Sequence, residues 1–152
     1  MKRFITLMLA MVMALSLAAC GSKDTASVDA AGLAKALAER VSFDSTMTAL
    51  SADDLGFYIE LPDKCTTGAY MSDGSTMEEI FVVACESKTD ADAVKVSIQA
   101  LLDSQKQEAE RYQAEEAARL DNAVFGTYGT CVVLCVTADT DTANAVIKEY
   151  VG

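Results

Sequence analysis

Cysteines carry most of the chemistry that this sequence could perform, because it has five of them and no histidine. A chain without histidine cannot build Ser-His, Cys-His or His-metal sites. Thiols and carboxylates are what remain. The cysteines are Cys20, Cys65, Cys85, Cys131 and Cys135.

Cys20 closes the segment LAACG (17–21) at the end of an N-terminal secretion signal. Lys2 and Arg3 precede an uncharged apolar run (4–17), which is followed by small residues. This order is typical of a signal peptide, and the run is short for a membrane-spanning helix. With a cysteine at the cleavage position, the segment is similar to the lipobox of bacterial lipoproteins. The resemblance implies cleavage before Cys20 and a palmitate-type lipid on its sulfur; the alternative is an ordinary cleaved signal.

The other four cysteines could form two disulfides in three connectivities, or stay reduced as small apolar side chains. The residues VVL between Cys131 and Cys135 favour a strand, which would place the two thiols on one face about 13 Å apart. They could then neither bond each other nor share a metal ion. If Cys85 lies beside this strand, it could bond one of these cysteines and leave Cys65 for the other thiol. We predict no metal site.

Carboxylates offer the second route to chemistry. Glu78 and Glu79 stand at the entrance to a predicted strand, and Asp90 and Asp92 stand at a predicted helix start, where acidic residues favour the helix dipole. Catalytic carboxyl groups would have to face each other across a cleft, which sequence spacing cannot show. Nucleotide-binding and nucleophile-elbow motifs are missing from the sequence. We therefore predict that the protein is not an enzyme and needs no cofactor.

The predicted mature chain is strongly acidic. Cleavage after residue 19 removes Lys2 and Arg3, so 10 of the 12 basic residues face 23 acidic ones and the formal charge changes from −11 to −13. Such a surface repels nucleic acid and anionic lipid headgroups. We expect no nucleic-acid partner and a membrane contact through the lipid on Cys20. A protein or small-molecule partner remains open.

The chain divides into a signal peptide (1–19), a lipidated tether (20–27) and a single domain (28–152). Helical periodicity predicts helices from Val28 to near Phe43, after Thr89 and after about residue 142. Two pairs of strand-like segments, 66–71 with 78–86 and 123–128 with 130–137, predict hairpins. The fold class is therefore α+β: a mostly antiparallel sheet of two β-hairpins, covered by one long helix and shorter terminal helices.

The longest helix is predicted to have Thr89 as its N-cap and to pack one face on the sheet. Lys106 belongs to the opposite, solvated face, and the helical composition continues to Leu120. The residues that recur at steps of three and four on the packed face are Val94, Ile98, Leu101, Leu102, Gln105, Ala109 and Tyr112.

Several short segments carry a family resemblance by their order. They are MSDG (71–74) before MEEI (77–80), DADAV (90–94), YQAEE (112–116) before RL (119–120) and NA (122–123), and YG (128–129). Over about residues 50–137 this order resembles a family of lipoproteins of Clostridia-like Gram-positive bacteria, whose domain has no assigned function. The resemblance implies a lipoprotein but no catalytic residues. The family often has proline at position 114, which would separate two helices, whereas this chain has Ala114.

Together these features predict a lipoprotein on the extracytoplasmic side of the cell membrane, anchored through Cys20. We expect its domain to be a non-catalytic interaction or ligand-binding module. The alternative is a cell-envelope enzyme, or an enzyme accessory, that uses carboxylates or thiols in an unfamiliar geometry.

Overall fold

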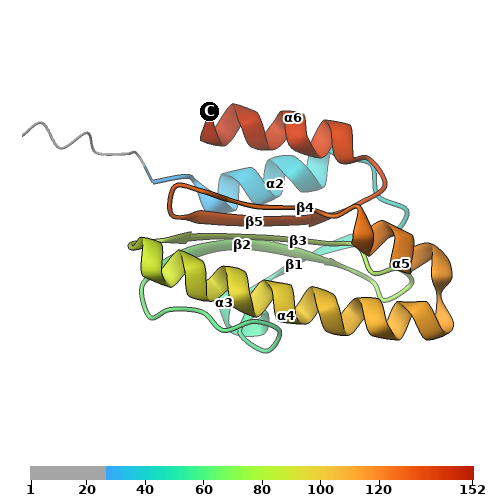
Figure 1. Cartoon of the computed structure of the whole chain (residues 1–152). Coiled ribbons are helices and arrows are strands. Elements are labelled where there is room, and N and C mark those ends of the chain that lie inside the picture. The colour runs from blue at the N-terminus through green and yellow to red at the C-terminus, as the bar shows by residue number, and fades with distance from the viewer. Residues whose placement is uncertain (1–26) are drawn as a thin grey trace, which may run out of the picture.

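An antiparallel five-stranded sheet organises the chain, with helices on both faces (Figure 1). The computed structural model describes residues 27–152, so the predicted signal peptide, Cys20 and the tether to residue 26 lie outside the described residues. The strands are β1 (Met47–Leu50), β2 (Cys65–Ser72), β3 (Glu79–Cys85), β4 (Val124–Tyr128) and β5 (Cys131–Val136), in the spatial order β1-β2-β3-β5-β4. The helices are α2 (Ala30–Arg40), α3 (Ala52–Leu55), α4 (Lys88–Tyr112), α5 (Ala114–Asp121) and α6 (Thr140–Val151). Within residues 27–152, no helix combines the length and apolar character needed to cross a membrane.

The predicted α+β fold class is confirmed. β2 with β3 and β4 with β5 form the two predicted hairpins. Gly74 and Gly129 adopt positive φ angles of 92° and 61° in the connecting turns, a conformation that glycine adopts without steric cost. The edge strand β1 was not predicted, because four residues are too few to establish an alternating pattern.

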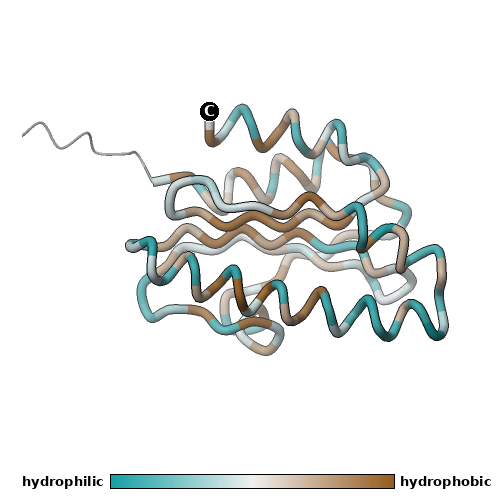
Figure 2. The backbone as a smooth tube through the Cα atoms, viewed as in Figure 1, coloured by the Kyte–Doolittle hydropathy of each residue, from teal (hydrophilic) through white to brown (hydrophobic). Residues whose placement is uncertain are grey.

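Each face of the sheet carries its own apolar core, and the central strands are strongly hydrophobic (Figure 2). Every residue of β3 and β5 is buried. Ile80 and Val82 point toward α2 and α6, while Phe81 and Val83 point toward α4. The continuous apolar run from Ile80 to Cys85 is therefore covered on both faces of the sheet.

Gly68, which interrupts the apolar pattern of β2, allows α2 to pack closely against the sheet. A Cβ atom at this position would lie 2.5 Å from the carbonyl oxygen of Ala30 and 2.6 Å from the Cβ of Ala34. No side chain fits in that space. The residue that weakens the strand signal in the sequence is therefore a requirement of the packing.

α4 begins slightly earlier than predicted, with Ser87 rather than Thr89 as its N-cap. The Ser87 Oγ atom accepts a hydrogen bond from the backbone N–H of Asp90 at 3.1 Å and donates one to its carboxylate at 2.6 Å. These bonds satisfy donors that the helix cannot pair internally. Asp90 therefore stabilises the helix start, as predicted.

The predicted packed face of α4 is mostly correct. Val94, Ile98 and Leu102 are buried, whereas Leu101 is only half-buried. Tyr112 was placed wrongly: its side chain is 79% exposed, because α4 runs past the end of the sheet (Figure 1).

The helical segment divides at Gln113, whose φ of −149° ends α4. α5 is therefore a separate helix, and it packs against α4. The Lys106 Nζ atom lies 3.0 Å from the Asp121 carboxylate, so α5 partly covers the face that was expected to be solvated. The two helices are therefore separate here, although this chain has Ala114 where the family often has a proline that would separate them.

Candidate functional site

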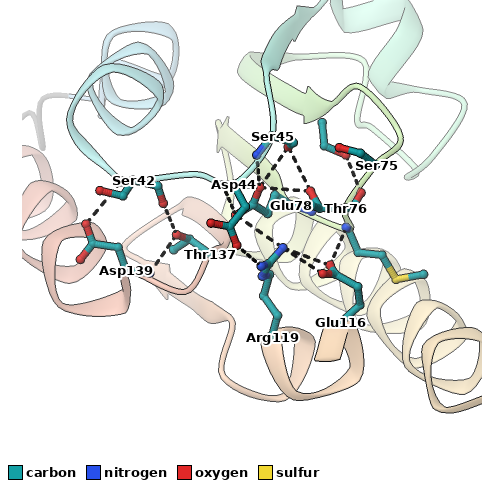
Figure 3. Close-up of polar contacts among 12 residues, drawn as sticks. Ser42, Asp44, Ser45, Ser75, Thr76, Glu78, Glu116, Arg119, Thr137 and Asp139 are labelled. Carbon is teal, nitrogen blue, oxygen red and sulfur yellow. Dashed lines mark hydrogen bonds and ion pairs between the residues drawn. The ribbon is translucent and has the colours of Figure 1, made fainter. Parts of the chain in front are cut away.

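A group of polar side chains gathers at one end of the sheet, where β3 begins and β5 ends (Figure 3). We call it the Arg119 network and define it by Asp44, Glu78, Glu116 and Arg119. Three segments far apart in the chain supply these residues: the α2–β1 loop, the residues just before β3, and α5.

Glu78 is the most deeply buried acid of the Arg119 network, with a fully buried side chain. Its carboxylate accepts hydrogen bonds from the backbone N–H groups of Asp44 and Ser45, each at 3.0 Å. The hydroxyl groups of Ser45 and Thr76 also donate to it, at 3.0 and 3.1 Å. These donors compensate for the lost hydration of the carboxylate and fasten the α2–β1 loop to the sheet.

Arg119 supplies the positive charge of the network from α5, and its side chain is only 12% exposed. Its guanidinium lies 3.0 Å from the Glu116 carboxylate and 3.6 Å from that of Glu78, and it also contacts Asp44. The other oxygen of Glu116 accepts the backbone N–H of Met77 at 2.7 Å. One buried cation thus joins three acidic side chains.

A second set of contacts ties the same loop to the β5–α6 connection. The Thr137 hydroxyl donates to the carbonyl oxygen of Ser42 at 2.8 Å, and the Ser42 N–H donates to Asp139 at 3.3 Å. Asp139 is also the N-cap of α6. Its carboxylate accepts a hydrogen bond from the backbone N–H of Thr142 at 3.3 Å, so it stabilises the start of α6 as well as the loop contact.

The carboxylates of Glu78 and Glu116 hold segments of the chain together through these contacts. Among the four residues, only Glu78 is considered in the sequence analysis as a candidate catalytic carboxylate. The local signal for the others is the i,i+3 spacing of Glu116 and Arg119. A depression of about 380 Å³ beside the network is lined by Arg119, Asn122 and Thr137, among others.

Glu79 occupies a different environment from Glu78, because adjacent residues of a strand point to opposite faces of the sheet. Burial raises the pKa of its carboxyl group to about 7. Gln105 of α4 donates one hydrogen bond to it at 3.2 Å. The second oxygen of Glu79 and the amide oxygen of Gln105 have no partner among the described residues. Both residues line a pocket of about 210 Å³.

Replacing Glu79 with glutamine should stabilise the domain at pH 8. The folded pKa of about 7 exceeds the ordinary 4.5, so the contribution of Glu79 to stability is fully present below about pH 4.5 and is lost as the pH rises to about 7. The loss amounts to about 3 kcal/mol above pH 7. A neutral amide avoids this loss, so the gain of Glu79→Gln should be about 3 kcal/mol at pH 8 and less than about 1 kcal/mol at pH 5. Urea denaturation at both pH values measures it.

Glu108→Gln is the matched control for this prediction, because Glu108 lines the same pocket from α4 but is exposed. It should change the free energy of unfolding by no more than about 0.5 kcal/mol, with little dependence on pH. A Glu79→Gln variant whose gain is equal at pH 5 and pH 8 would contradict the assignment of a raised pKa to Glu79.

The structure divides the four remaining cysteines between the two faces of the sheet, and all four are free thiols. Cys131 and Cys135 lie on β5 and pack in the core beneath α2 and α6, as the strand prediction required. Cys65 and Cys85 pack on the α4 face, directly opposite each other on β2 and β3. The suggestion that Cys85 could bond a cysteine of β5 is wrong, because Cys85 and the β5 thiols point to opposite faces. Within the described part of the chain, no cluster of three or more metal-ligating side chains occurs.

Comparison with known proteins gives one match. Residues 39–137 match the family model described as Domain of unknown function (DUF4358). The matched segment contains the whole Arg119 network, together with Glu79 and the two cysteine pairs. Neither the curated proteins nor the solved structures gave a match.

Proposed function

The chain belongs to the family of the domain of unknown function DUF4358, and we propose that it is a lipid-anchored extracytoplasmic lipoprotein whose domain binds a partner without catalysis. The lipobox-like segment around Cys20 supports the anchor, as does the resemblance to lipoproteins of Clostridia-like bacteria. The acidic surface suits a domain that is held at a membrane by its lipid and not by its own charge.

The single observation that carries this proposal is that the N-terminal end of the described chain and the Arg119 network lie at opposite ends of the sheet. Ser27, where the described chain begins, lies beside Thr130 at one end of the sheet. Helix α5 and the start of β3 lie at the opposite end (Figure 1), and they carry the Arg119 network and the Glu79 pocket. The seven residues from Gly21 to Ser27 can span at most about 25 Å. A lipid on Cys20 would hold the Ser27 end near the bilayer and present the network end to partners.

The contacts of the Glu78 carboxylate and the raised pKa values of the cysteine thiols support a binding role. The buried carboxylate of Glu78 is engaged by five separate groups of the protein. Burial raises the pKa of every described cysteine, to about 11 for Cys85 and about 12 for Cys131 and Cys135. A thiol nucleophile requires a thiolate, which these environments disfavour at neutral pH.

Cys20→Ala should release the protein from the membrane or leave it as an uncleaved precursor. A single acyl chain binds a membrane marginally, whereas the two chains of a diacylglyceryl group anchor stably. Membrane and soluble fractions of expressing cells, compared by immunoblotting, measure this. Protease treatment of intact cells should degrade the wild-type domain if it faces outward.

Cys65→Ala is the matched control, because it removes a thiol from the folded domain and leaves the lipobox unchanged. This variant should remain in the membrane fraction. Mass spectrometry that finds an unmodified mature N-terminus at another residue would refute the anchor.

Glu79 favours one second candidate, an envelope enzyme or enzyme accessory that uses this carboxyl group. A pKa of about 7 suits a general acid or base, and the group borders a pocket. Complementation of a deletion strain separates the two candidates. Glu79→Gln should restore the wild-type phenotype if the domain only binds, and should fail, despite normal protein levels, if Glu79 transfers protons.

A further inference from the structure

Cys65 and Cys85 are direct register partners at the end of the β2–β3 hairpin. Directly opposed residues of antiparallel strands have Cα atoms about 4.5–5.5 Å apart, within the range of about 4.4–6.8 Å that a disulfide requires. Both side chains point to the α4 face and pack in the same core. Closing a disulfide therefore needs rotation of the side chains but little movement of the backbone.

We propose that Cys65 and Cys85 form a cross-strand disulfide, and that Cys131 and Cys135 remain thiols. This goes beyond the proposed function and does not depend on the lipid anchor. The bond would close the hairpin at the end of the sheet that lies beside Ser27. It would be a structural cross-link of the domain.

The register excludes the other pairings. Cys131 is opposite Ala84, so it points to the α2 face while Cys85 points to the α4 face. Cys135 is opposite Ile80, near the other end of β3. Cys131 and Cys135 are four residues apart on one strand, about 13 Å, which is too far for a bond.

An oxidant can reach the pair through a depression of about 550 Å³ that both cysteines line. Cys65 is half-buried, and its thiol donates to the carbonyl oxygen of Pro62 at 3.4 Å. Cys85 is 6% exposed. Cys65 is therefore the thiol that meets the oxidant first.

The oxidant is a disulfide compound, and the reaction is thiol–disulfide exchange. The Cys65 thiolate attacks one sulfur of the oxidant, which forms a mixed disulfide and releases one thiol. The Cys85 thiolate then attacks the Cys65 sulfur and displaces the second thiol. The two cysteines lose two protons and two electrons in total, and the oxidant's disulfide is reduced to two thiols.

This pair should react slowly. Burial raises the pKa of both thiols, and Asp90 raises them further. Fast redox centres have depressed thiol pKa values, so that the thiolate is abundant. This environment is typical of a stable structural disulfide and not of a fast redox centre.

Thiol counting tests the proposal. The full chain with Cys20→Ser is purified in detergent, incubated with glutathione disulfide, denatured without reductant and alkylated with iodoacetamide. Two of the four cysteines should be alkylated, against four before oxidation. Trypsin cuts after Lys64 and Lys88 and nowhere between them. The peptide 65–88 should therefore be two hydrogen atoms lighter and unalkylated.

Three outcomes would overturn the proposal. They are four alkylated cysteines after oxidation, a stable glutathione adduct on Cys65 with Cys85 alkylated, and a disulfide within the peptide 120–148, which holds both β5 cysteines.

Thermal unfolding supplies an independent measurement. Closing a hairpin of this length should raise the melting temperature by about 10 °C relative to the reduced protein. Cys65→Ser should abolish the difference between the oxidised and reduced forms. Cys135→Ala should preserve it, because that thiol takes no part in the bond.

Discussion

Arg119→Ala should destabilise the domain by about 3–5 kcal/mol, because it removes the cation from a buried ionic network. The Glu78 side chain is fully buried and that of Glu116 is 11% exposed, so both carboxylates would keep their desolvation cost and lose the attraction of the Arg119 guanidinium. The α2–β1 loop would also lose the Arg119 contact with Asp44. Urea denaturation at pH 7, monitored by circular dichroism, measures the change.

Arg40→Ala is the matched control, because it makes the same substitution in an exposed ion pair. The Arg40 guanidinium donates two hydrogen bonds to Glu149, at 2.6 and 2.8 Å, but both side chains are about half exposed. Water replaces such contacts readily, so the loss of stability should be much smaller than for Arg119→Ala. Equal losses in the two variants would show that burial does not govern the strength of the Arg119 network.

Phe81→Ala should cost about 3–5 kcal/mol, a large part of the 5–15 kcal/mol that stabilises a typical domain. Phe81 lies in the middle of the central strand β3, is fully buried, and is the largest side chain buried to this extent among the described residues. Its removal leaves a cavity between the sheet and α4. The expected result is a strongly lowered melting temperature or failure to fold.

Phe57→Ala makes the same substitution at a side chain that is 86% exposed. Its free energy of unfolding should change by no more than about 0.5 kcal/mol. If Phe57→Ala destabilised the domain as much as Phe81→Ala, the assignment of the α4-face core would be wrong.

The hairpins and helices could be predicted because their signals are local. The apolar run at 80–85 and the segment CVVLCV (131–136) are rich in β-branched side chains, which favour a strand, and both are strands in the structure. Gly74 and Gly129 mark the turns, and the stripe through Val94 and Ile98 identifies the packed face of α4. Each of these signals depends only on residues that are close to each other in the sequence.

The predictions that failed on α4 concern residues whose surroundings are set by distant segments of the chain. Tyr112 continues the helical stripe, but α4 outruns the sheet, so nothing covers it. Lys106 lies on a charged face, but α5 returns over that face and brings Asp121 to it. Periodicity indicates which residues share a face of a helix, whereas only packing decides what that face meets.

The sequence by itself determined the fold class and the absence of histidine chemistry, because each depends on composition or on neighbouring residues. The tertiary structure decided which side chains meet. Glu78 and Glu79 are adjacent in the chain, yet the alternation of a strand sends the Glu78 side chain to the buried Arg119 network and the Glu79 side chain toward Gln105 of α4, where burial raises the pKa of its carboxyl group. The same alternation, together with the register of three strands, makes Cys65 the partner of Cys85 and separates both from Cys131 and Cys135. Strand order and register arise from contacts between distant segments, which the spacing of residues along the chain does not encode.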